Sequence, residues 1–215
     1  MTDRIVRTGT PSLCAPGRLY LQITAEVSRS LNQNIVETAR LMALMSIILA
    51  DVGTAAWESK YHWLRERPVT AVRDSASRDG NPLTAPDASW VPLGAPASNT
   101  AQAPDFTPPF PAQPSGHASF GGAFAETLRY FVGTDQFPVT FVSDEYSGQS
   151  RDRVGKLRPR VPRTFASFTE MEVENAQSRM YLGIHWQKDA TTGIKLGNEV
   201  ARYILALPIY KLYEK

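Results

Sequence analysis

Apolar side chains recur at helical spacing over most of this chain, and the pattern predicts a fold built from helices. The clearest case runs from 35 to about 65, where apolar residues return at intervals of three and four. Shorter stretches of the same kind predict helices at about 19–31, 115–132, 169–182 and 185–207. No stretch has a persuasive strand-like pattern, and 143–162 reads as a polar connection. We therefore expect an all-α bundle of about five or six helices.

The segment 74–114 differs from the rest because prolines interrupt it too often for a long helix. Pro68, just before it, should end the preceding helix, since the residue before a proline disfavours the α region. Three aromatic residues are interleaved with the prolines: Trp90, Phe106 and Phe110. They favour a packed, functional loop rather than a linker. We expect a single domain over 1–215, with the proline-rich loop 74–114 lying over the active site.

Composition narrows the possible partners. A chain of 215 residues that is 42% hydrophobic can bury one real core. The 23 Lys+Arg and 21 Asp+Glu leave a net charge of only +2, which favours neither nucleic acid nor an anionic membrane. The longest apolar run, 41–50, is too short for a membrane span, which needs about 20 residues. No signal peptide is seen at the start, the localisation stays open, and the lone Cys14 excludes an intrachain disulfide.

Three separated stretches carry the candidate chemistry: Lys60-x6-Arg67-Pro68, Pro114-Ser115-Gly116-His117, and Ser178-Arg179-x5-His185-x3-Asp189. Together they supply three cations, a hydroxyl, a backbone amide and two imidazoles. Donors of this kind suit an oxyanion, since guanidinium offers a planar fork and ammonium a point charge. Each motif alone also has a bland explanation: a solvated basic stripe on a helix, a serine helix cap, or a surface carboxylate. Their occurrence together in one chain favours a single anion site.

The positions of the histidines support the hypothesis of a single anion site, because the chain has only three histidines. Two lie inside the motifs, and His62 matches no motif position, so we expect it to be structural. Ser115 and Gly116 would open a helix, whose free amides and positive dipole end attract anions. His185 and Asp189 stand four residues apart. The carboxylate can therefore accept the second ring N–H and fix the imidazole tautomer.

These motifs, with their surroundings, resemble those of the vanadium-dependent haloperoxidases, within the superfamily shared with type-2 phosphatidic acid phosphatases and bacterial class A acid phosphatases. The resemblance covers roughly 15–205. It includes Trp57 to His62 before the first motif, the Thr107-Pro108-Pro109-Phe110-Pro111 approach to the second, and the run from Glu174 to Trp186. Phosphatases share the bare motifs but usually lack the proline-rich approach and the Gly-Ile-His-Trp setting, which favours the haloperoxidase branch.

The resemblance implies a vanadate-dependent peroxidase that oxidises halide with hydrogen peroxide to a hypohalous species, for an organic acceptor that the sequence does not identify. It implies that vanadate, or phosphate in the same place, is bound by Lys60, Arg67, Ser115, Gly116 and Arg179. His185 would be the axial vanadium ligand, with Asp189 as its partner, and His117 would assist deprotonation of the peroxide. Trp57 and Phe110 match positions near the halide, although core packing explains them as well.

Two alternatives stay open: a phosphate monoester hydrolase with His185 as nucleophile through a phosphohistidine, and a non-catalytic oxyanion-binding bundle. The chain also departs from the family where aromatics usually precede the motif arginine, having Arg65-Glu66, and where Arg-Phe is usual, having Gln187-Lys188. Finally, the 35–65 helix is apolar nearly all round, and such a helix must be buried. We therefore expect a homodimer or a larger assembly, with this helix or the 19–31 helix at the contact.

Overall fold

A computed structural model describes residues 16–74, 80–94, 106–151 and 155–211 of the chain. Within these residues, seven helices and two strands follow in the order α1 (Pro16–Ser30), α2 (Ile35–Trp63), α3 (Pro68–Asp74), α4 (Gly116–Val132), β1 (Val139–Ser147), β2 (Arg160–Phe165), α5 (Phe168–Tyr181), α6 (Gln187–Ala206) and α7 (Pro208–Lys211). The all-α class is confirmed, and each predicted helix is present within a few residues of its expected bounds. Cys14 lies outside the described residues.

The long helix α2 has clear signals at both ends. Asn34 caps its start, because the Asn34 side chain accepts from the backbone amides of Val36 and Glu37 while Glu37 reaches back to the cap. Leu64 ends it in the left-handed conformation, with φ 47°. The helix thus stops before Pro68, as predicted. The short helix that Pro68 then begins was not predicted, although proline suits a first helical position.

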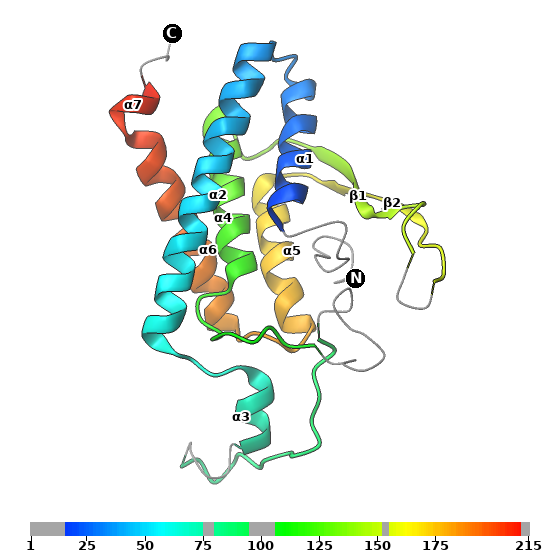
Figure 1. The fold of residues 1–215 in the computed structure, drawn as a ribbon, viewed down its shortest axis with the longest axis vertical. Coiled ribbons are helices and arrows are strands. Elements are labelled where there is room, and N and C mark those ends of the chain that lie inside the picture. Colours follow the sequence, from blue (N-terminus) through cyan, green and yellow to red (C-terminus); the bar gives the residue numbers. More distant parts are fainter. Residues whose placement is uncertain (1–15, 75–79, 95–105, 152–154, 212–215) are drawn as a thin grey trace.

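The main helices form a bundle with α4 at its centre. α4 packs against α6, α5 and α2, while α1 packs against α2. In Figure 1 the last turn of α2, the start of α4, the end of α5 and the start of α6 all reach the same, lower end of the bundle. The largest core cluster lies among α1, α2, α4, the strands and α5, and includes the buried side chains Ile23, Leu41, Met45, Phe124 and Phe168. The single-domain assignment of 1–215 stays a prediction.

Small residues let α4 and α6 approach each other closely. A Cβ atom added at Gly197 of α6 would lie 2.2 Å from the carbonyl oxygen of Ser119 on α4, and one added at Gly193 would lie 2.7 Å from that of Ser115. Any side chain at these glycines would therefore force the helices apart. The contact fixes the N-terminal ends of both helices relative to each other.

The expectation of a polar connection over 143–162, without a sheet, is wrong in part. β1 and β2 form a two-stranded antiparallel sheet in which Val139 pairs with Phe165 and Thr140 with Thr164. Val139 and Phe165 are buried against the bundle, whereas the two threonine hydroxyls hydrogen bond at 2.8 Å on the exposed side. The alternation is genuine but spans only a few residues, too short a signal to separate from a loop by sequence alone.

The described part of the proline-rich loop packs beside the end of α5, consistent with the expected cover over the site. The amide of Gly94 donates to the carbonyl of Leu182 at 3.1 Å. A Cβ added at Gly183 would meet Pro92 at 3.2 Å and Trp90 at 3.3 Å. These contacts place residues 90–94 next to the segment that leads into His185. The parts of the loop at 75–79 and 95–105 lie outside the described residues.

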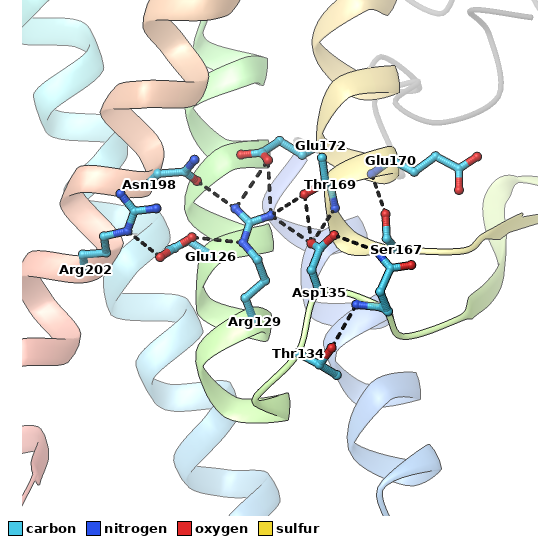
Figure 2. Close-up of polar contacts among 11 residues, drawn as sticks. Glu126, Arg129, Thr134, Asp135, Ser167, Thr169, Glu170, Glu172, Asn198 and Arg202 are labelled. Atoms are coloured by element: carbon cyan, nitrogen blue, oxygen red, sulfur yellow. Dashed lines mark hydrogen bonds and ion pairs between the residues drawn. The ribbon is translucent and has the colours of Figure 1, made fainter.

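A polar network built around Arg129 joins three helices away from the site end of the bundle (Figure 2). The guanidinium donates to Glu126 and Asp135, and it donates from two nitrogens to Glu172 at 3.3 and 3.4 Å. It also reaches Asn198 of α6 at 3.2 Å. Burial raises the pKa of Glu172, and the neighbouring Arg129 opposes that rise. The network therefore ties α4, α5 and α6 together near the C-terminal end of α4.

In the parts of the chain that the structure describes, no helix is both long and apolar enough to cross a bilayer. α2 is covered within the chain on most of its apolar sides: Met45, Ile48, Leu49 and Val52 are all buried. Ile35, Val36 and Ile47 remain exposed on it. The argument for a homodimer through α2 is correspondingly weaker, and the oligomeric state stays a prediction.

Candidate active site

Lys60 lies in the last turn of α2, and its ammonium group is directed into the bundle. The residue is 0% exposed. Nζ donates to the carbonyl oxygens of Pro111 at 2.9 Å, Ala112 at 3.0 Å and Pro114 at 2.5 Å. Three acceptors match the three protons of an ammonium group. Lys60 thus ties the end of the proline-rich loop to α2, and direct contact with an anion stays a prediction.

Arg67 lies between α2 and α3 and reaches towards the segment after α5. Its Nε donates to the carbonyl of Phe110 at 2.9 Å, and its Nη1 to the carbonyl of Ile184 at 2.8 Å. Nη1 also lies 3.0 Å from Nε2 of His185. Nη2 is buried without a hydrogen-bond partner among the described residues. The guanidinium therefore has an unused donor beside the imidazole.

Ser115 caps α4, so the helix begins one residue later than predicted, at Gly116. The Ser115 amide donates to the carbonyl oxygen of Asp189 at 2.9 Å, and Oγ accepts from the amide of Ala118 at 3.4 Å. The first amides of a helix have no acceptor within it and lie at its positive end. A Cβ added at Gly116 would lie 3.0 Å from the Trp57 ring, so glycine is needed where the ring and the helix meet.

The contact expected between His185 and Asp189 is present, but not along one helix. α6 begins only at Gln187, so His185 precedes it and Asp189 folds back as its third helical residue. Asp189 Oδ2 lies 3.1 Å from Nδ1 of His185 and accepts from the Trp186 amide at 2.9 Å. Because a carboxylate accepts, the proton belongs on Nδ1. The lone pair on Nε2 is left facing Arg67.

Arg179, in the last turn of α5, is buried, and its Nε has no hydrogen-bond partner among the described residues. Asn175, one turn earlier, donates from Nδ2 to the carbonyl of His117 at 2.8 Å, which joins α5 to the first turn of α4. Tyr20 of α1 also reaches this place: burial raises its pKa, while the charge of Arg179 and the Asn175 amide oppose the rise. Neither neighbour was predicted from the sequence. Asn175 lies four residues before Arg179, a usable signal, whereas nothing local marks Tyr20.

The site concentrates positive charge in a buried volume. Burial, reinforced by Arg67, lowers the pKa of Lys60 to about 7, although Asp189 opposes this. Burial likewise lowers the pKa of Arg67 and of Arg179 to about 10. The pKa of His185 lies well below its ordinary value because of burial and the three nearby cations. Burial of several cations together, with repulsion among some of them, favours the binding of an anion.

The remaining ionisable groups follow the same logic. Burial, then Arg179 and His185, hold the pKa of His117 well below its ordinary value, so its imidazole is neutral at pH 7. Burial raises the pKa of Asp189, and the cations oppose that rise. With both imidazoles neutral, each can accept a proton or use a lone pair.

The predicted aromatic residues lie at the site as well. The rings of Trp57 and Phe110 are 5.1 Å apart between centroids. Nζ of Lys60 lies 5.6 Å from the first centroid and 5.2 Å from the second, and Cζ of Arg67 lies 5.1 Å from the Phe110 centroid. The aromatic faces therefore contact the cations. Their relation to a halide stays a prediction.

Other sequence candidates lie outside this cluster. His62 is exposed at the end of α2 and packs edge-on against Trp63, with centroids 4.8 Å apart. The Glu66 side chain is exposed, so the acid next to Arg67 does not share its burial, while the Glu66 carbonyl accepts from Nε1 of Trp186 at 3.1 Å. Lys188 is exposed too. The departures from the family pattern therefore alter the rim of the site more than its buried donors.

The residues present fit a tetrahedral or trigonal-bipyramidal oxyanion. Two buried guanidinium nitrogens, one each from Arg67 and Arg179, lack partners among the described residues. The start of α4 adds amides, and His185 adds an unprotonated nitrogen. Within the same part of the chain, no group of three or more His, Cys, Asp or Glu side chains could hold a bare metal cation. Donors of this kind suit phosphate or vanadate.

Comparisons with known proteins agree with this description. Residues 40–209 match the family model of the VCPO second helical-bundle domain. The chain is 37% identical over 216 residues to a vanadium chloroperoxidase of Curvularia inaequalis, covering 85% of this chain and 34% of the relative. It is 29% identical over 184 residues to a vanadium-dependent bromoperoxidase of Ascophyllum nodosum, covering 86% of this chain and 26% of that protein.

Solved structures show the same likeness. A bacterial vanadium-dependent iodoperoxidase matches with a TM-score of 0.68 and 28% identity, over 89% of this chain and 39% of that one. The holo form of a bacterial vanadium-dependent chloroperoxidase matches with a TM-score of 0.62 over 86% of this chain and 39% of that one. At 18% identity, the second shows the fold alone. The chain spans about a quarter to a third of the length of the curated relatives it matches.

Proposed function

This chain belongs to the vanadium haloperoxidase family, and we propose that it binds vanadate and oxidises halide with hydrogen peroxide to a hypohalous species. The observation that carries the proposal is the buried group of cations with unused donors beside Nε2 of His185. The family relation supports it, since two curated relatives are a vanadium chloroperoxidase and a vanadium-dependent bromoperoxidase.

In this proposal several side-chain and backbone donors would hold vanadate together. Arg67 and Arg179 bind its oxygens through their unpartnered nitrogens. Ser115 and Gly116 add the hydroxyl and amide at the start of α4. Lys60 contributes its charge across the site and keeps the loop in place. Nε2 of His185 would bind the vanadium, because Asp189 holds the ring proton on Nδ1.

When bound, the vanadate supplies Lewis-acid activation of peroxide without changing oxidation state. The chain's own contribution is proton transfer and exclusion of water. His117 is neutral at pH 7 and accepts the proton that hydrogen peroxide loses. Its backbone is fixed by the bond from Asn175. Trp57 and Phe110 form an apolar wall on the cations, suited to a poorly hydrated halide.

The same donors would accept phosphate, and the lone pair on Nε2 of His185 would also suit a nucleophile for phosphoryl transfer. A paired assay separates the two functions. Purified protein is tested for halide-dependent oxidation by hydrogen peroxide with and without orthovanadate, beside hydrolysis of a phosphate monoester. We expect vanadate-dependent oxidation of at least one halide. Monoester hydrolysis without any halide oxidation would refute the peroxidase proposal and favour the hydrolase.

Histidine variants provide the matched test of the site. His185→Ala should abolish vanadate-dependent oxidation and weaken vanadate binding, because it removes the nitrogen that would bind the vanadium. His62→Ala is the control and should change neither, since that ring is exposed. Equal losses in both variants, with unchanged circular dichroism, would show that the histidine assignment is wrong.

A further inference from the structure

A cavity lies beside the candidate active site, and none of its lining residues belongs to the proposed oxyanion site. Its volume is about 340 Å³, and it is lined by Trp63, Arg65, Gln113 and Lys188. Gln113 stands two residues before Ser115, Arg65 two before Arg67, and Lys188 directly before Asp189. The cavity therefore adjoins the active site along the chain. Its lining residues belong to the end of α2 and the segment after it, the segment before α4 and the first turn of α6. These ends of α2, α4 and α6 lie at the lower end of the bundle in Figure 1.

Backbone contacts fix the walls of this cavity to the active site. The amide of Ala112 donates to the carbonyl of Arg65 at 2.8 Å, and Nη1 of Arg65 donates to Oε1 of Gln113 at 3.2 Å. Arg65 also interacts electrostatically with the active site. Burial raises the pKa of Asp189, and the charge of Arg65 helps to oppose that rise. The walls of the cavity are thus tied to residues of the active site.

The lining is cationic and aromatic at once. Arg65 and Lys188 are exposed, and within the described residues neither forms an ion pair, including with the neighbouring Glu66. Trp63 is 67% exposed, an unusual placement for an indole, and His62 supports its ring edge-on. Two uncompensated cations beside a free aromatic face favour a ligand that carries both a ring and a negative charge.

The volume limits the size of that ligand. Sites for small molecules begin at about 300 Å³, so 340 Å³ holds one ring with a carboxylate but no extended chain. The ring would pack on Trp63. The carboxylate would face the planar fork of Arg65 and the ammonium of Lys188.

We propose that the cavity of Trp63, Arg65, Gln113 and Lys188 binds a single-ring aromatic carboxylate, and that this ligand is the organic halogen acceptor. The second half rests on the proposed function. Hypohalous acid leaving the active site would transfer its halogen to a ring carbon. The new carbon–halogen bond forms as the C–H and O–halogen bonds break, the arene loses two electrons to the halogen, and the ring proton leaves with hydroxide as water.

Binding is tested on the full chain without peroxide or halide, using 4-hydroxybenzoate and its neutral analogue 4-hydroxybenzamide, by calorimetry or ligand-observed NMR. Each titration is run with and without saturating inorganic phosphate, which occupies the oxyanion site. We expect the carboxylate to bind several-fold more tightly than the amide. An exposed ion pair changes affinity by about 2- to 5-fold, so Lys188→Gln should reduce this preference by that factor and leave amide binding unchanged. Trp63→Leu should weaken both ligands.

Lys195→Gln is the matched control, because it removes one positive charge from the same helix at an exposed position. It should leave both affinities unchanged. Equal affinity for carboxylate and amide, an unchanged preference in Lys188→Gln, or displacement of the carboxylate by phosphate would each overturn the binding site. The last result would place the ligand in the oxyanion pocket instead.

The acceptor role has its own readout. In the active enzyme, Lys188→Gln should raise KM for halogenation of 4-hydroxybenzoate about 2- to 5-fold, with kcat and the rate of halide oxidation unchanged. An unchanged KM alongside lost binding preference would overturn the acceptor role. Binding as expected with no halide oxidation at all would overturn the proposed function while the ligand class of the cavity stands.

Discussion

Lys60 should make oxyanion binding depend on pH near neutrality. Its pKa is lowered to about 7, first by burial and then by Arg67. The three carbonyls around Nζ require three protons, so the structure corresponds to the charged lysine. Above pH 7 the free protein progressively loses this charge. Binding of an anion that needs the charge on Lys60 is then coupled to the uptake of a proton by Nζ.

The size of the effect follows from this linkage. Sulfate keeps a fixed charge over the whole range, so only the protein titrates. Between the pKa of free Lys60 and its higher value in the complex, sulfate affinity should fall about tenfold per pH unit, or about 1.4 kcal/mol. In the free protein His117 and His185 stay neutral over this range, because burial and the nearby cations hold their pKa values well below the ordinary one. Arg67, with a pKa of about 10, stays charged up to about pH 9.

The assay is calorimetric measurement of the sulfate Kd from pH 6 to 9 at constant ionic strength. Wild-type affinity should be nearly constant below pH 7 and fall steeply above it. Lys60→Met should bind weakly with no slope, and Lys60→Arg, which keeps its charge, should bind without a slope at any pH tested. Circular dichroism at each pH checks the fold. A wild-type Kd that is the same at pH 7 and pH 9, or an equal slope in Lys60→Arg, would refute the reasoning.

Two further changes test other parts of the structure. Asp189→Asn should weaken vanadate binding about 10- to 100-fold, because the carboxylate that holds the proton on Nδ1 of His185 is lost; vanadate titration measures this. Gly197→Ala should lower the free energy of unfolding by about 2 kcal/mol, because its Cβ would meet a carbonyl oxygen of α4 at 2.2 Å; urea denaturation measures this.

Each change has a control elsewhere in the chain. Asp51→Asn, at an exposed position of α2, should leave vanadate affinity unchanged; a loss equal to that of the site variant would point to a general charge effect. A Cβ added at Gly17 would meet no atom within 4 Å, so Gly17→Ala should not destabilise the protein. Equal effects of the Gly17 and Gly197 substitutions would disprove the close helix contact.

Much of the fold follows from local sequence signals. The apolar spacing over 35–65 placed α2 to within two residues at its end, because a helix that buries a continuous face must repeat its apolar residues every three to four positions. Proline density marked 74–114 for an equally local reason. The β1–β2 hairpin was missed since Val139 and Phe165 carry an alternation of only a few residues. The boundary at His185 was misplaced because Trp186, rather than a Ser, Thr, Asp or Asn, caps α6.

The candidate site, like the fold, was predicted from the sequence only in part. The motifs by themselves named Lys60, Arg67, Ser115, Arg179 and His185 as one group, since cations and imidazoles at those spacings have few joint uses. Only the packing of the helices decided how each is used. Three carbonyls of the loop accept hydrogen bonds from Nζ of the lysine. Two guanidinium nitrogens have no hydrogen-bond partner among the described residues.

Contacts between distant segments leave no mark on local periodicity. Tyr20 on α1 approaches Arg179 on α5 because both helices pack in one bundle, and no spacing rule links positions so far apart. The ends of α4 and α6 meet because Gly193 and Gly197 allow close contact. The sequence alone therefore determined the elements and the chemical inventory of the site. The tertiary structure decided which donors remain open to a ligand, because that depends on which backbone groups fill the others.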